Sequence, residues 1–461
     1  MTYLKLILGA ATAIALTACV SEPLPAPDAL VETVAEPEMI VDVHKGDFAE
    51  IQQFVTPGGV SVWLVSEPSI PILSLEMAWR GGETSDPEGL EGLSDSVAYN
   101  MNEGAGDLDS LAFQTRMEEL NMSFGCSTGN DWTSCSSSML TENATDAIDL
   151  IATAFAAPRF DDGPFARFQR ENLIGIKQRE TSPNWLARTA TANALYPDHP
   201  YARQTSVESI SALTPALARE HMRKLMVKDR MLVTAVGAVM PEALALMIDK
   251  AVEGLPDTSE IDAVADITLP VAPAEPILVD LPQPQSLVSF SAPGLKRDDS
   301  DFFTAYVLNY TVGGGGFESR LMKTLRVEKG LTYGIYTRLS NSDHLNVWSG
   351  GGQTKNESVG EFLTGIHDEL NQFVADGVTP DELDDAKAYL TGSYALGFDS
   401  NAKIADQMMG VRQEELGIDY FDTRNTKINA VTLDDVNRVA KDYLSPDKFT
   451  FVIVGEPEGI E

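Results

Sequence analysis

The residues with the greatest capacity for metal or thiol chemistry are five histidines and three cysteines. No two histidines have the i, i+3 or i, i+4 spacing that would place two imidazoles on one helix face. The sequence therefore predicts structural or surface roles for them and no zinc site of their own: His44, His199, His221, His344 and His367.

Two of the cysteines flank a predicted β-hairpin turn at Asn130-Asp131, within residues 121–139. Counted outward from that turn, Cys126 faces Cys135 at a non-hydrogen-bonded pair, where antiparallel strands lie closest. A disulfide needs such a short separation, and it persists outside the cytoplasm. We expect this pair to be bridged, with two free buried thiols as the alternative.

The third cysteine ends a segment that is typical of a signal peptide. Residues 1–19 read MTYLKLILGAATAIALTAC, with Lys5 before an apolar core that is too short to span a bilayer. The end of this segment resembles the bacterial lipoprotein signal, in which Cys19 becomes the lipidated first residue. The resemblance implies an envelope lipoprotein of a diderm bacterium, and Val20 favours the outer membrane. An ordinary cleavable signal is the alternative.

Composition excludes some classes of partner. The chain has 461 residues, of which 43 % are hydrophobic, so it can bury substantial cores. Lys and Arg number 33 against 69 Asp and Glu, giving a formal charge of −36. Such a charge argues against nucleic-acid binding through phosphates and against a basic patch on anionic lipid.

Two blocks of similar size follow the signal and contain a repeat. Residues 210–237 align without a gap with residues 428–455, and each copy contains a predicted helix, a turn and an apolar strand ending in Gly. Strands alternate with helices, so we expect an α+β fold. The predicted segments are a lipoprotein signal peptide (1–18), an acidic Pro-rich tether (19–45), a first domain (46–253), a linker (254–276) and a second domain (277–461).

Two stretches resemble the pitrilysin/insulinase-type zinc peptidases, in particular the processing-peptidase branch. They are LYPDHPY at 195–201 and VLNYTVGGGGFESRLMKTLRVEKGLTYGIYTR at 307–338. The resemblance covers about residues 48–456. It implies two duplicated α+β domains, each an antiparallel sheet packed by helices, which together form half of a clamshell.

The zinc motif of that family is degenerate in this sequence. Active members carry H-x-x-E-H, in which two His bind zinc and the Glu is the general base, and a second Glu further along completes the site. The matching positions here hold Asp95, Ala98, Tyr99 and Gly175. We therefore expect no zinc in this chain and no catalytic residue of its own, with zinc present only in a partner subunit.

The second block keeps a motif, LRVEKGLTY at 325–333, that the resemblance links to substrate binding. In two-component family members one subunit carries zinc and the other grips substrate through an Arg/Tyr pair, which matches Arg326 and Tyr333. An Arg offers a planar fork of donors, and a Tyr hydroxyl can donate to a developing oxyanion. The alternative is that Arg326 caps a helix and Tyr333 is a core residue.

The leading hypothesis is a non-catalytic, substrate-binding subunit of a heterodimeric zinc peptidase, with a homologous zinc-bearing partner. One alternative is a peptide-binding or scaffold protein without peptidase activity. Another is an active metallopeptidase with an unusual site that uses Asp95 and Tyr99.

Overall fold

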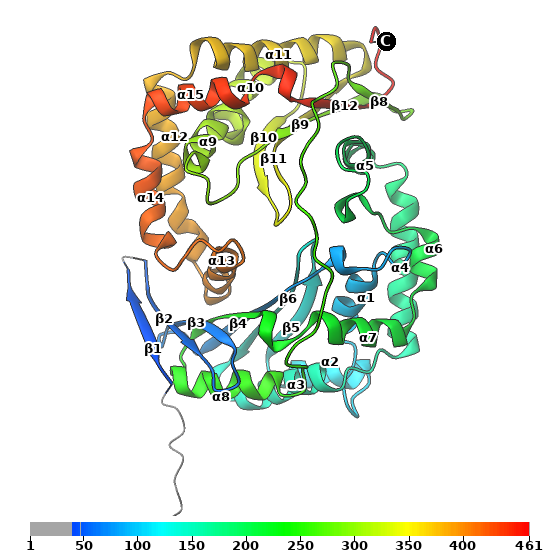
Figure 1. Ribbon diagram of the computed structural model, residues 1–461, viewed down its shortest axis with the longest axis vertical. Coiled ribbons are helices and arrows are strands. Elements are labelled where there is room, and N and C mark those ends of the chain that lie inside the picture. Colours follow the sequence, from blue (N-terminus) through cyan, green and yellow to red (C-terminus); the bar gives the residue numbers. More distant parts are fainter. Residues whose placement is uncertain (1–38, 47, 461) are drawn as a thin grey trace, which may run out of the picture. The chain divides into compact units, whose positions relative to one another are not determined.

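The computed structural model describes residues 39–46 and 48–460 (Figure 1). The predicted signal peptide, Cys19 and most of the predicted tether lie outside these residues. No helix in the described ranges combines the length and apolarity needed to cross a bilayer. One boundary needs correction, because the end of the predicted tether, Val41–Lys45, is a strand that pairs antiparallel with Glu50–Val55.

The first sheet has seven strands in the order β1-β2-β3-β7-β4-β6-β5. Its only parallel pair within the described residues is β3 with β7, and the other neighbours are antiparallel. The strands are β1 (Val41–Lys45), β2 (Glu50–Val55), β3 (Ser61–Ser66), β4 (Ile72–Arg80), β5 (Met122–Thr128), β6 (Trp132–Leu140) and β7 (Met231–Gly237).

Eight helices belong to the same part of the chain. With the exception of the fifth, their apolar residues, among them Ile151 of the third and Ile248 of the eighth, form one core with the sheet. The helices are α1 (Leu93–Asn100), α2 (Ser110–Glu119), α3 (Ala144–Ala156), α4 (Asp162–Arg179), α5 (Pro183–Leu195), α6 (Val207–Ala212), α7 (Pro215–Leu225) and α8 (Pro241–Val252).

The second sheet has five strands in the order β10-β11-β9-β12-β8, and β12 pairs with β8 in parallel. Two π-helical turns, Tyr310–Gly314 and Lys323–Glu328, interrupt its helices. The strands are β8 (Ile277–Asp280), β9 (Gln285–Pro293), β10 (Ile335–Asn341), β11 (Asn346–Lys355) and β12 (Thr450–Gly455). The helices are α9 (Phe302–Asn309), α10 (Arg320–Met322), α11 (Val359–Asp376), α12 (Pro380–Gly392), α13 (Asn401–Gln413), α14 (Tyr420–Ala430) and α15 (Leu433–Tyr443).

The α+β fold with two helix-packed sheets is as expected, but the sheets are mixed rather than purely antiparallel. Each parallel pair joins strands that are far apart in sequence, so the intervening chain provides the long crossover that parallel pairing needs. The repeat also extends beyond the residues that revealed it. Helices α4, α5 and α7 begin at residues 162, 183 and 215, and α12, α13 and α15 begin at 380, 401 and 433, each 218 later.

Two of these repeated helices are exchanged between the halves (Figure 1). Helix α13 packs through Met408 on Trp63 and Val65 of the first sheet, and the Thr234 hydroxyl donates to the Ala405 carbonyl at 2.7 Å. Reciprocally, α5 packs through Ala187 on the second sheet, against β8, β9 and β12. Each exchanged helix therefore covers part of the second face of the other half's sheet, and the burial of β3 on both faces explains its almost continuous apolar run, VWLV.

Candidate functional site

Helix α1, which carries three of the degenerate motif positions, is fixed at its start by a buried carboxylate. Asp86 accepts hydrogen bonds from the backbone N–H groups of Gly92, Leu93 and Ser94 at 2.8, 3.0 and 2.8 Å. The hydroxyl of Ser94 also donates to it at 2.6 Å. A negative charge at the positive end of a helix is stabilising, so Asp86 holds α1 in place.

A buried histidine completes this cluster. His221 Nε2 lies 2.8 Å from Ser94 Oγ and 3.3 Å from Asp86 Oδ1. The same ring nitrogen faces both partners and Ser94 is fully buried, so the three residues do not form an accessible nucleophilic triad. His221 is structural, as predicted for it. The sequence did not predict that Asp86 and Ser94 would contact His221. The residues that meet here are separated by up to 135 positions (221 − 86).

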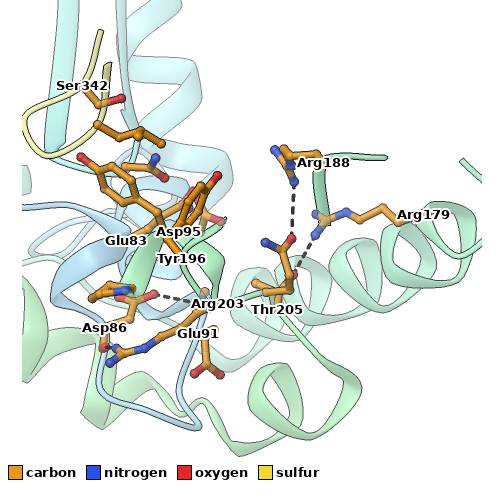
Figure 2. Close-up of a pocket in the computed structure, with 16 residues that line it drawn as sticks. Glu83, Asp86, Glu91, Asp95, Arg179, Arg188, Tyr196, Arg203, Thr205 and Ser342 are labelled. Carbon is orange, nitrogen blue, oxygen red and sulfur yellow. Dashed lines mark hydrogen bonds between the residues drawn. The ribbon is translucent and has the colours of Figure 1, made fainter. Parts of the chain in front are cut away.

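Asp95, in the first turn of α1, lines a cavity of about 380 Å³ (Figure 2). Burial, with the nearby charges of Glu83 and Asp86, raises the pKa of Asp95 to about 7. Burial and Asp86 also raise the pKa of Glu83, on the same wall, although Arg188 and Arg179 act in the opposite direction. Near neutral pH the Asp95 carboxyl is therefore only partly ionised, whereas an exposed carboxyl would be fully ionised.

Three arginines line the same cavity. Arg179 Nη1 donates to the Thr205 hydroxyl at 2.7 Å, and Arg188 Nη2 reaches the Gln204 side-chain oxygen at 3.5 Å. Arg203 Nη1 donates to the Asp86 backbone carbonyl at 3.0 Å. All three acceptors are neutral. Across the part of the chain that the structure describes, none of the three has a carboxylate oxygen within 4.0 Å.

The remaining motif positions lie outside this cavity. Tyr99 OH accepts a hydrogen bond from Arg167 Nε at 2.9 Å, and Arg167 Nη2 lies 2.5 Å from Glu103 Oε1. Burial raises the pKa of the Tyr99 phenol. Ala98 is buried. Gly175 lies on α4, and a Cβ there would meet no described atom within 4 Å, so packing does not require glycine at this position.

The Arg/Tyr pair is on the second half. Arg326 lies in the π-helical turn Lys323–Glu328, with its guanidinium 4.2 Å from the centroid of the Phe317 ring. Gly330, with φ +65°, turns the chain toward β10, and the side chain of Tyr333 before that strand is 86 % exposed. Tyr333 is therefore not a core residue. In the described chain no hydrogen bond joins Arg326 to Tyr333, and neither lines the Asp95 cavity.

A groove of about 660 Å³ runs between α5 and the part of the second sheet that α5 leaves uncovered. Trp185 lines it from α5, Ser289 from β9 and Tyr336 from β10, which is an edge strand. The groove shares Arg188 and Tyr196 with the Asp95 cavity, so the two spaces adjoin. None of these lining residues was identified from the sequence, since they converge only through the packing of α5 on the second sheet.

Comparison with known proteins identifies the family. The Peptidase M16 inactive domain matches residues 212–390. The chain is 24 % identical to the non-peptidase homolog YmxG of Helicobacter pylori, over 84 % of this chain and 89 % of that protein. It also superposes on the crystal structure of a peptidase M16 inactive domain from Pseudomonas fluorescens with a TM-score of 0.82 at 25 % identity, covering 89 % of this chain and 99 % of that one. The chain is thus similar to M16 peptidase family proteins over most of its length.

The fold of part of a longer protein matches as well. The periplasmic protease PqqL of Escherichia coli aligns with a TM-score of 0.78 at 16 % identity, over 95 % of this chain and 49 % of PqqL. The resemblance drawn from the two sequence stretches at 195–201 and 307–338 is thus confirmed at the level of the family.

The zinc ion of active M16 members does not fit the residues of this chain. Of the four motif positions only Asp95 offers a carboxyl group, and Tyr99 is held against the Arg167 cation, which disfavours a divalent metal. Ala98 and Gly175 provide no ligand atom. Within residues 39–46 and 48–460 no three His, Cys, Asp or Glu residues form a group that could hold a metal ion. We derive no chemical step through zinc in this chain.

The other histidines are dispersed, with one exception. His199 and His344 come within 6.1 Å of each other, between ring centroids, and each is bound to the linker, His199 to the Ala265 carbonyl and His344 to Asp266. The sequence spacing gave no sign of this pairing. Asp266 is the nearest carboxylate partner, at 3.0 Å from His344 Nδ1.

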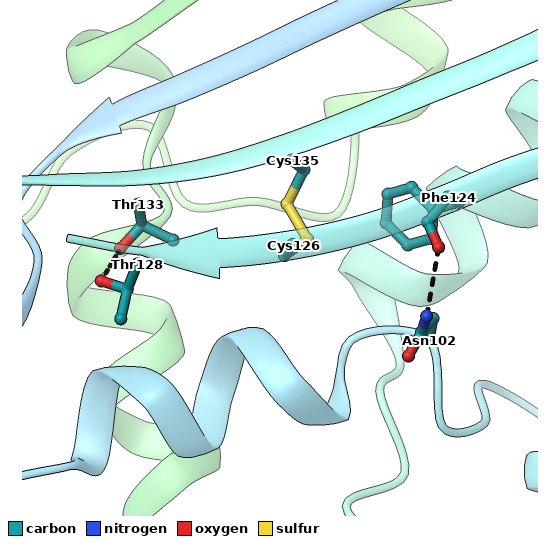
Figure 3. The surroundings of a disulfide bond; sticks show 6 residues. All are labelled: Asn102, Phe124, Cys126, Thr128, Thr133 and Cys135. Carbon is teal, nitrogen blue, oxygen red and sulfur yellow. Dashed lines mark hydrogen bonds between the residues drawn. A yellow bond between two sulfur atoms is a disulfide. The ribbon is translucent and has the colours of Figure 1, made fainter. Parts of the chain in front are cut away.

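The predicted cysteine pair is bridged in the structure (Figure 3). Cys126 pairs with Cys135 in the antiparallel register of β5 and β6, with 4.0 Å between their Cα atoms. The backbone N–H of Gly129 donates to the Trp132 carbonyl at 2.8 Å, which closes the two-residue turn. Counting residues outward from the turn at Asn130-Asp131 therefore predicted the observed strand register, in which the two cysteines are opposite each other.

Proposed function

We propose that this M16 protein is a non-catalytic, substrate-binding subunit of a heterodimeric zinc peptidase. The observation that carries the proposal is a contrast between its two halves. The motif positions of the first half do not fit zinc, whereas the LRVEKGLTY segment of the second half presents an exposed Tyr333 and an Arg326 without a carboxylate partner in the described chain.

The two side chains suit the binding of a peptide. The planar guanidinium of Arg326 can donate two parallel hydrogen bonds to a carboxylate, or bind a backbone carbonyl. The Tyr333 hydroxyl can donate to a carbonyl oxygen that gains negative charge while the partner subunit performs hydrolysis. Neither role requires metal in this chain.

The test is co-expression with a homologous subunit that has an intact H-x-x-E-H motif, followed by assay of peptide cleavage. We expect Arg326→Ala and Tyr333→Phe each to lower kcat/KM of the complex at least tenfold, because each removes a hydrogen bond to substrate or to the oxyanion. Tyr389→Phe is the matched control, since Tyr389 is an exposed tyrosine that stacks on Tyr310. Unchanged cleavage in both variants would refute the substrate-binding role.

A peptide-binding or scaffold protein without a peptidase partner is the second candidate. It is favoured by the groove beside α5, whose lining residues all come from this one chain. Stable homodimers in native extracts, with no zinc-bearing companion, would support it. An active enzyme that uses Asp95 and Tyr99 would instead show stoichiometric zinc that is lost with activity in Asp95→Ala.

We also propose that the protein is lipid-anchored through Cys19 at the periplasmic face of the cell envelope, in the outer membrane. The signal-like sequence and a disulfide suited to an oxidising compartment support this location. Metabolic labelling with a palmitate analogue should label the wild-type protein and not Cys19→Ser. Label retained in that variant would refute the anchor.

A further inference from the structure

The Asp95 cavity contains cations that no carboxylate of the described chain neutralises. The two most relevant are Arg179, near the end of α4, and Arg188, on α5. They reach consecutive residues, Thr205 and Gln204, so their guanidinium groups lie close together (Figure 2). Two neighbouring guanidinium groups repel each other unless an anion lies between or beside them.

Most of the hydrogen-bonding capacity of these arginines is unused. Each guanidinium has five N–H donors, and in the described structure each makes one hydrogen bond, to a neutral oxygen. A planar fork of free N–H groups matches the two oxygens of a carboxylate. The chemistry of this wall of the cavity is therefore that of an anion site.

The carboxyl groups of the facing wall form no ion pair within 4.0 Å with these two arginines in the described chain. Glu83 and Asp95 lie across from the arginines in Figure 2 together with Tyr196. Burial, and then the charge of Asp86, raise the pKa of Glu83; burial, and then the charges of Glu83 and Asp86, raise that of Asp95, and the nearby arginines only oppose these shifts. Two more acidic residues line the cavity: Asp86 is engaged by the start of α1 and by Ser94, and Glu91 accepts a hydrogen bond from the Gly89 N–H at 2.9 Å.

The shape of the space indicates what kind of anion would enter. Its volume of about 380 Å³ is within the range of roughly 300–1,000 Å³ typical of ligand pockets. It adjoins the groove beside α5 through Arg188 and Tyr196, and that groove is bordered by the free edge strand β10. An extended chain in the groove could therefore place its end in the cavity, beside Arg188.

We propose that the cavity beside α1 binds the C-terminal carboxylate of a peptide, with Arg179 and Arg188 as the residues that hold it. The residues that precede this carboxylate lie in the groove between α5 and the second sheet. The site belongs to this chain alone and needs no zinc-bearing partner, so it extends the proposed function without depending on it.

The test compares two ligands that differ only at the end that the cavity recognises. The probes are N-acetyl-tetraalanine as the free acid and the same peptide as the C-terminal amide, titrated into the purified full chain by calorimetry. We expect the acid to bind at least tenfold more tightly, because charge-assisted hydrogen bonds to two arginines are lost in the amide. Equal affinities, or no binding of either peptide at millimolar concentration, would overturn the proposal.

Substitutions of the two arginines test whether they cause the preference for the free acid over the amide. Arg179→Gln and Arg188→Gln should each reduce the ratio of acid to amide affinity, and the double variant should abolish it. Arg179→Lys should retain part of the preference, since it keeps the charge and loses the fork. Arg170→Gln is the control, because Arg170 is an exposed residue of the same helix α4 outside the cavity.

A third probe, tetraalanine amide with a free N-terminus, tests the opposite orientation. If it binds more tightly than the acetylated acid, the carboxyl groups of Glu83 and Asp95 hold an amine and the proposal is wrong. The experiment uses the isolated chain, so its failure would leave the Arg326 and Tyr333 test on the two-subunit complex unaffected.

Discussion

At the scale of single residues, the positions that the resemblance assigns to the zinc motif do not fit a metal ion. Asp95 stands at the first ligand position, yet its surroundings raise its pKa to about 7 instead of preparing it to bind a cation. Tyr99 has acquired an arginine partner, Arg167. These changes replace one metal-centred site with a network of carboxyl and guanidinium groups.

The raised pKa of Asp95 predicts a dependence of stability on pH. The folded protein retains a proton that the unfolded chain releases between about pH 4 and 7, so the free energy of unfolding falls as pH rises through this window. In Asp95→Asn the side chain cannot ionise, so this fall in the free energy of unfolding should not occur. We expect the variant to be about 1–3 kcal/mol more stable than wild type at pH 8 and equal to it near pH 4.

Urea unfolding at the two pH values measures this difference. Asp198→Asn provides the control, because Asp198 is exposed and outside the cavity. A variant that is no more stable than wild type at pH 8 would show that the Asp95 carboxyl carries no such penalty.

At the scale of elements, the hairpin of β5 and β6 is where local sequence determined structure most directly. The turn at Asn130-Asp131 sets the register, and the register places Cys126 opposite Cys135. Strand β6 also pairs with β4, and Cys135 is fully buried in the first core. The bridge therefore ties the edge strand β5 to the interior of the sheet.

Removal of this bridge should lower stability. We expect Cys126→Ala combined with Cys135→Ala to reduce the free energy of unfolding by about 2–3 kcal/mol, the loss of loop-closure entropy for a loop of this length. Thermal unfolding with and without reductant provides the measurement. Reductant should shift the midpoint of the wild-type protein and leave that of the double variant unchanged, and a wild-type midpoint insensitive to reductant would contradict the prediction.

At the scale of the whole described molecule, the two halves are joined by exchanged helices in addition to the linker. Arg412 of α13 is buried, with its guanidinium 3.0 Å from the Ser61 carbonyl and 2.6 Å from the Val233 carbonyl. It also lies 5.2 Å from the Trp63 ring, and burial lowers the pKa of Arg412 to about 10. A residue of the second block thus completes the hydrogen bonding and the core of the first sheet.

This exchange predicts that the halves remain together when the linker is cut. A protease site placed within residues 268–274 should yield two fragments that co-elute in gel filtration. Ala405→Asp should separate them, because it puts a charge into the fully buried contact of α13 with the first sheet. Lys403→Ala, an exposed change on the same helix, should not. Separation of the wild-type fragments would refute the prediction.

The fold could be predicted from the sequence where the signal was local or repeated. The repeat at an offset of 218 indicated duplication, and local motifs such as the capping box of Thr379 and Glu382 begin helices at the positions that their sequence favours. The exchange of α5 and α13 could not be predicted, because an amphipathic helix shows which face is apolar and not which sheet covers it. For the same reason the cavity of Arg179 and Arg188 was not foreseen.

The exchanged helix also sets an order of events during chain elongation. Strand β7 ends at Gly237 and α13 begins at Asn401, so 164 residues (401 − 237) separate the completed first sheet from the helix that covers its second face. At roughly 5–20 residues per second this interval is on the order of 10–30 s. During that time α13 has not yet been synthesised, so Trp63 and Val65 remain exposed on the second face of the first sheet. We expect this exposed apolar surface to bind a chaperone.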